Sequence, residues 1–72
     1  MDNALEILKQ VWVNSTGKKY SVDRHKGKGG RSDYLMLTEH TKKNGHPKRY
    51  RFSIPAPMVR QVVEAMLEAL EP

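Results

Sequence analysis

The fold is decided by two stretches of sequence, Gly17-Lys18-Lys19-Tyr20-Ser21-Val22-Asp23 and Asp33-Tyr34-Leu35-Met36-Leu37-Thr38-Glu39. In both stretches apolar residues recur at every second position, at Tyr20, Val22, Leu35 and Leu37. That period is typical of a strand with one buried face. Residues 26–31, between the two stretches, are rich in glycine and predict a turn. We therefore expect a β-hairpin with one aliphatic face and one basic face that carries an aromatic residue.

The flanking sequence extends this hairpin into a sheet. Val11 and Val13 point inward in a first predicted strand, which leaves Trp12 on the outer face. Asn44-Gly45 favours a hairpin turn before the last strand. Pro57 and the apolar spacing after it indicate a helix, which we expect on the aliphatic face. The prediction is an α+β fold of one domain, 1–72, with an antiparallel meander of four strands over 7–14, 18–25, 33–41 and 48–54, and a helix over 57–70.

The length and composition predict that two chains assemble. The 72 residues include no cysteine, which excludes disulfides and thiolate zinc sites. One helix is about 10 Å wide and strands lie about 4.8 Å apart, so the helix covers only two or three strands. Part of the sheet and both of its edges would stay bare. A homodimer with two-fold symmetry removes both defects.

Positive charge is concentrated on the predicted strands and turns. The net charge is +5, and residues 15–51 hold eleven of the 13 Lys and Arg residues but three of the 8 acidic residues. This pattern favours a polyanionic partner. No apolar run approaches the roughly 18–20 residues of a membrane span, and the first residues do not resemble a secretory signal. We expect a cytoplasmic protein with access to the nucleoid and no membrane association.

Cations and aromatic residues on one sheet face are typical of proteins that bind single strands, where cations hold phosphates and aromatic rings stack on bases. A duplex reader needs a basic recognition helix, whereas Arg60 is alone on an acidic predicted helix. Tyr34 and Trp12 could instead pack in a dimer interface. The predicted phosphate contacts are Lys18, Lys19, Lys26, Lys28, Arg31, Arg49 and Arg51, and the predicted stacking residues are Tyr34 and Trp12.

Other functions find less support in the sequence. The glycines of residues 26–31 lack the P-loop pattern and precede no helix, so a mobile turn explains them better than a phosphate cradle. His25, His40 and His46 lack the spacing of metal ligands. We expect no catalytic residues, metal, cofactor or small-molecule substrate. The competing hypothesis is a protein-interaction or dimerisation module whose basic face binds an acidic protein.

The same residues resemble a single PUR repeat of the Pur-alpha family, the purine-rich element binding proteins, and its bacterial relatives. The resemblance rests on Gly17-Lys18-Lys19-Tyr20-x-Val22-Asp23, Tyr34-Leu35-x-Leu37-x-Glu39 and Arg51-Phe52-x-Ile54 with a closing helix, and it runs from about Leu8 to Leu70. It implies a Whirly-like domain completed by homodimerisation that binds single-stranded DNA or RNA, often purine-rich or G-rich. Arg24, His25 and the long glycine-rich loop depart from the family pattern.

Overall fold

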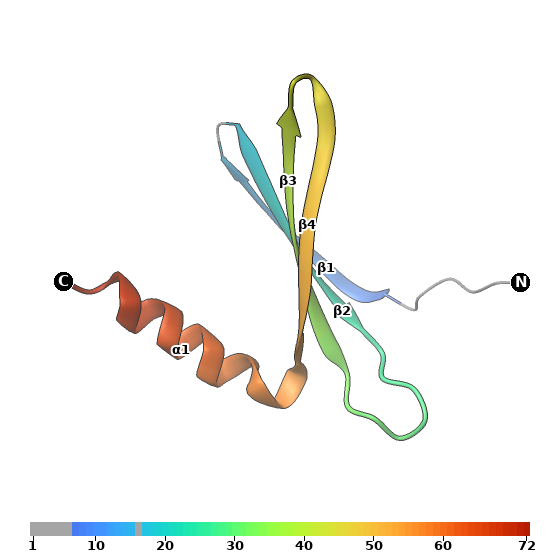
Figure 1. The fold of residues 1–72 in the computed structure, drawn as a ribbon. Coiled ribbons are helices and arrows are strands. Elements are labelled where there is room, and N and C mark those ends of the chain that lie inside the picture. Colours follow the sequence, from blue (N-terminus) through green and yellow to red (C-terminus); the bar gives the residue numbers. More distant parts are fainter. Residues whose placement is uncertain (1–6, 16) are drawn as a thin grey trace, which may run out of the picture.

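The computed structural model describes residues 7–15 and 17–72 and contains one four-stranded sheet followed by a helix (Figure 1). The strand order is β1-β2-β3-β4, and each strand pairs antiparallel with the next one in sequence. The predicted α+β class and ββββα meander are confirmed. The elements are β1 (Ile7–Ser15), β2 (Lys18–His25), β3 (Tyr34–Lys43), β4 (His46–Pro55), the 3-10 helix η1 (Ala56–Met58) and α1 (Val59–Leu70).

The third and fourth strands are longer than predicted because the hairpin between them closes on two residues. Asn44 and Gly45 have φ angles of 54° and 79°. Positive φ at both central positions is the type I′ geometry, which matches the twist of the flanking strands. Pairing therefore continues as far as Lys43 and His46. Pro47 is tolerated there because β4 is an edge strand.

The pairing register divides the sheet into two faces. Val11, Val22, Leu37 and Phe52 form one row across the four strands, and Trp12, Ser21, Thr38 and Arg51 form the next. Because side chains alternate along a strand, adjacent rows lie on opposite faces. The apolar face includes Lys9, Val11, Val13, Lys18, Tyr20, Val22, Arg24, Leu35, Leu37, Glu39, Thr41, Lys48, Tyr50, Phe52 and Ile54. The polar face includes Gln10, Trp12, Asn14, Lys19, Ser21, Asp23, His25, Tyr34, Met36, Thr38, His40, Lys42, Arg49, Arg51 and Ser53.

The helix does not lie on the apolar face, so that prediction is wrong. α1 projects away from the sheet (Figure 1), and Leu67 and Leu70 on its apolar stripe are 59% and 81% exposed. The connection sets this direction. Pro55 has an extended conformation with ψ of 138°, and the Ala56 amide donates to the Asp33 carbonyl at 2.8 Å. This hydrogen bond fixes the chain just before the helix, in a direction that points α1 away from the sheet.

The described residues of a single chain consequently form no apolar core. No apolar side chain among the described residues is buried, and Phe52 in the middle of the apolar face is 56% exposed. The molecule is flat, with extents of 38 × 37 × 15 Å. No helix within the described ranges is long and apolar enough to cross a membrane.

Candidate nucleic-acid interface

The most buried residues of the chain lie on the polar face. Ser21, His25 and Thr38 are 2%, 4% and 5% exposed. Within residues 7–15 and 17–72 no helix covers this face, so their burial comes from the longer side chains around them. A cavity of about 230 Å³, here called the central cavity, lies over them and is bordered by Trp12 and Arg51. The polar face is thus hollowed at its centre. The apolar face carries a hollow of similar volume, about 240 Å³, bordered by Tyr20, Leu37 and Phe52, but it holds no buried side chain among the described residues.

Trp12 is held on the polar face with much of its ring accessible. Its ring centroid lies 4.9 Å from that of His40, with 33° between the planes. Its indole Nε1–H donates to Gln10 Oε1 at 3.1 Å. His40 is held in turn, because its Nε2 and Ser21 Oγ lie 2.9 Å apart in a hydrogen bond. Trp12 is still 46% exposed, so one side of the indole can accept a stacked base.

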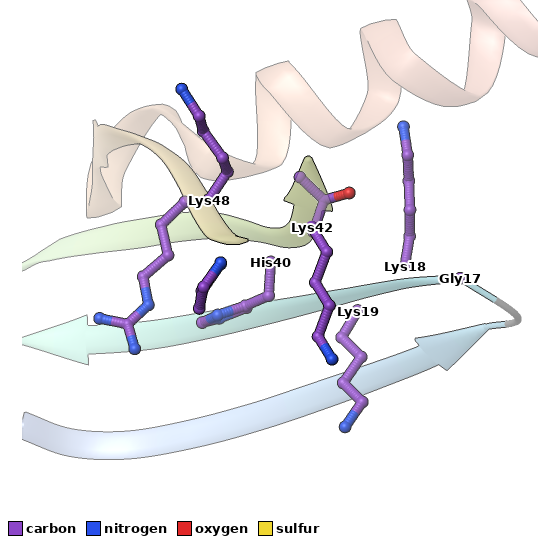
Figure 2. Close-up of a pocket in the computed structure, with 9 residues that line it drawn as sticks. Gly17, Lys18, Lys19, His40, Lys42 and Lys48 are labelled. Carbon is purple, nitrogen blue, oxygen red and sulfur yellow. The ribbon is translucent and has the colours of Figure 1, made fainter. Parts of the chain in front are cut away.

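Beside Trp12 the polar face collects cations. Lys19, His40 and Arg49 are direct neighbours in one row across β2, β3 and β4. Opposite residues of this kind have Cβ atoms about 4.5–5.5 Å apart. A second cavity of about 610 Å³, here called the turn-end cavity, is bordered by these three residues and by Lys42. Figure 2 shows Lys19 and Lys42 on the same side of the sheet. In the described part of the chain, no carboxylate forms an ion pair with Lys19, Lys42 or Arg49.

Lys18 points the other way, as Figure 2 shows. Although Lys18 borders the turn-end cavity, its Nζ lies 3.1 Å from Glu39 Oε2 on the apolar face. The Tyr20 hydroxyl donates to the same oxygen at 2.9 Å. The hydrogen bonds from Lys18 and then Tyr20 lower the pKa of Glu39, and the Glu39 hydrogen bond raises the pKa of Lys18. The structure therefore separates Lys18 from Lys19, and a phosphate contact for Lys18 stays a prediction.

Tyr34 lies on the polar face as predicted, but not beside Trp12. Its ring stacks on His25, with centroids 5.1 Å apart and planes at 10°. One side of the Tyr34 ring is thus occupied, and the residue is only partly exposed. His25 Nδ1 is buried and has no hydrogen-bond partner among the described residues. Of the two predicted stacking residues, Trp12 has the more accessible ring.

The loop between β2 and β3 is fixed at its base by Asp33. Arg24 donates to Asp33 Oδ2 through Nε at 3.1 Å and Nη2 at 2.9 Å, and the Gly27 amide donates to Oδ1 at 3.0 Å. These hydrogen bonds, the one from Gly27 first, lower the pKa of Asp33. A Cβ at Gly27 would lie 2.2 Å from the Arg31 carbonyl oxygen, so the loop closes tightly and needs glycine there.

The loop cations lie apart from the cluster around Trp12. Lys26, Lys28 and Arg31 are exposed, and none of them borders the central or the turn-end cavity. Their contact with phosphates stays a prediction. Arg51, in contrast, borders the central cavity next to Arg49 and Trp12. The residues that the structure brings together are thus Trp12, Lys19, Arg49 and Arg51.

Two further residues of the polar face, next to these four, were not predicted as site residues. His40 was considered only as a metal ligand, and Lys42 was assigned to a turn. His40 and Lys42 lie two and four positions after Thr38 in β3 and therefore share its face. This alternation could have identified both residues from the sequence. No group of three His, Cys, Asp or Glu residues able to hold a metal ion occurs in the ranges that the structure describes.

No family model, no curated protein and no solved structure matches the chain. The PUR resemblance therefore stays an expectation that rests on the quoted residues, and a function has to be argued from the geometry of the polar face.

Proposed function

We propose that the protein binds single-stranded DNA or RNA on its polar face. The observation that carries the proposal is the exposed indole of Trp12 beside three cations, Lys19, Arg49 and Arg51, on one hollowed surface. An aromatic ring stacks on a base at a gain of roughly 1–3 kcal/mol, and the cations follow the phosphates. Trp12 on β1 is the diagonal neighbour of Lys19 on β2, and Arg49 and Arg51 border the central cavity from β4, so a nucleic-acid strand laid across the sheet meets both kinds of contact.

The same arrangement favours single strands over a duplex. A base can stack on Trp12 only where it is not already stacked in a helix, and an extended strand offers such bases. A duplex reader would need a basic helix for the major groove. In α1 the only cation is Arg60, against Glu64 and Glu68. The PUR resemblance adds an expected preference for purine-rich or G-rich sequence. The expected location, from the sequence, is the cytoplasm with access to the nucleoid.

The binding protein is, in this proposal, a homodimer of Whirly-like architecture. Two apolar surfaces of each chain are left open: the apolar face, with Val11, Val13, Tyr50 and Phe52, and the stripe of α1, with Val63, Met66, Leu67 and Leu70. Covering eight such half-exposed side chains contributes on the order of 10 kcal/mol per chain, as much as the whole stability of a small domain. A second copy offers both matching surfaces, so α1 of one chain covers the sheet of the other.

The decisive test compares Trp12→Ala with the matched control Trp12→Phe. A labelled purine-rich single strand of about 12 nucleotides and its duplex are titrated at two salt concentrations. We expect single strands to bind more tightly and Trp12→Ala to weaken their binding by about 5-fold to 150-fold, the equivalent of about 1–3 kcal/mol. Trp12→Phe keeps an aromatic surface and retains most of the affinity.

Equal and weak binding of single strands and duplex would show that the polar face attracts nucleic acid only through nonspecific charge. No binding at low salt would contradict the proposal and favour the alternative, a module that binds an acidic protein. If Trp12→Ala binds like the wild type, the indole is not the stacking surface.

A further inference from the structure

His40 occupies the point where the two cavities of the polar face meet. It borders both the central cavity and the turn-end cavity. Its ring contacts Trp12, where the stacking surface lies, and its strand neighbours are Lys19 and Arg49, where the cations lie. Any strand that stacks on Trp12 and reaches these cations has to pass the imidazole.

The surroundings of His40 are cationic or neutral on every side. β1 contributes Trp12 and the neighbouring Asn14, and β2 contributes Lys19 and the hydroxyl of Ser21. β4 contributes Arg49 opposite and Arg51 diagonally. On β3 itself, Lys42 and Thr38 lie two positions away on the same face. In the described chain the only carboxylate that borders either cavity is Asp23, and its Oδ1 accepts from Gln10 Nε2 at 2.7 Å.

We propose that His40 binds a phosphate of the nucleic acid as an imidazolium between Lys19 and Arg49. This inference rests on the proposed function and adds a regulation of the same site. With Nε2 in the hydrogen bond to Ser21, Nδ1 is the nitrogen left for the ligand, and protonation makes the ring a charged donor. An anion bound beside a histidine favours its protonated form. Binding therefore takes up a proton, and affinity increases as the pH falls from about 8 to about 6.

The experiment measures the dissociation constant of the same labelled single strand at about pH 6, 7 and 8, each at several salt concentrations. For the wild type we expect about fivefold tighter binding at pH 6 than at pH 8. The slope of log K against log salt should also be steeper by about 0.7 at pH 6, the effect of one added phosphate contact on a single strand. Calorimetry in buffers of different ionisation enthalpy should find proton uptake on binding.

Three variants assign the effect to His40. His40→Gln should lose both the pH dependence and the change in salt slope. His40→Arg keeps a permanent charge and can stack on Trp12, so it should bind at pH 8 as tightly as the wild type does at pH 6. His46→Gln is the matched control, because His46 is exposed, borders neither cavity and is in phase with Tyr50 on the apolar face of β4. It should behave like the wild type.

The outcomes separate this inference from the proposed function. Binding that is independent of pH, or a pH dependence that His40→Gln retains, overturns the role of His40 while single-strand binding itself stands. Absence of single-strand binding at every pH overturns both. If His40→Gln fails to fold by circular dichroism, His40→Arg and the proton uptake of the wild type still decide the question.

Discussion

Lys18 and Lys19 are adjacent in β2, yet the alternation of the strand sends their side chains to opposite faces. Lys19 pairs with His40 on the polar face, whereas Lys18 forms an ion pair with Glu39 on the apolar face. Lys19→Ala should weaken single-strand binding and reduce the slope of log K against log salt by about 0.7. Lys18→Ala, the same chemical change one position away, tests the phosphate contact that the sequence predicts for Lys18: a site confined to the polar face leaves the slope unchanged. Salt titrations of the two variants check this, and equal slopes would contradict the assignment of the polar face.

At the residue scale, the alternation of side chains along each strand predicted which of them share a face of the sheet. Trp12, Tyr34, Arg49 and Arg51 all lie on the polar face, as the alternation required. It could not predict that Tyr34 stacks on His25, because that contact depends on the side-chain conformation of a cross-strand neighbour. Nor could composition reveal that Lys18 is held by an ion pair, although the alternation already placed it apart from Lys19.

At the scale of elements, the loop between β2 and β3 depends on one carboxylate. The pKa of Asp33 lies below its usual range, because the Gly27 amide and then Arg24 donate to its charged form. A lowered folded-state pKa means that the stabilisation is present above the unfolded value and is lost as the pH falls through the folded one. Asp33→Asn should therefore lower the melting temperature near pH 7, and its difference from the wild type should shrink below about pH 4.

Thermal melts of both proteins from about pH 7 to pH 3 make this measurement. Glu64→Gln on the exposed side of α1 is the control and should show a small difference at every pH. A difference in melting temperature between wild type and Asp33→Asn that stays constant down to about pH 3 would show that the carboxylate charge does not stabilise the loop.

The elements themselves were largely predictable, whereas the position of the helix was not. Alternation defined four strands, and the Asn44-Gly45 pair marked the turn between the last two. The apolar stripe of α1 predicts that something covers it, but the same stripe fits a sheet of its own chain or of a second one. The direction is decided by the short connection at Pro55 and Ala56, whose geometry depends on a hydrogen bond to Asp33.

For the whole molecule, folding and assembly should be one process. Because each chain lacks a buried apolar core among the described residues, the melting temperature should increase with protein concentration. Each tenfold increase in protein concentration favours the folded dimer over free chains by about 1.4 kcal/mol. Circular dichroism melts over a hundredfold concentration range, with sedimentation to determine the mass, provide the test.

Leu67→Glu places a charge on the apolar stripe of α1 and should shift the population to unfolded or monomeric chains. Glu68→Lys, one position along on the other side of the helix, is the matched control and should remain dimeric. A monomer of wild-type sequence that melts cooperatively at all concentrations would contradict the dimer.

The alternation in β2 also limits how this sequence can change in length. One residue inserted between Gly17 and Asp23 would exchange the faces of every following side chain in the strand, because the register repeats every two positions. An insertion just before Lys19 would turn Lys19 to the apolar face, and Tyr20 and Val22 to the polar one. Insertions or deletions of two residues preserve both faces. Related chains should therefore differ in strand length by even numbers and concentrate odd changes in the loop of residues 26–32.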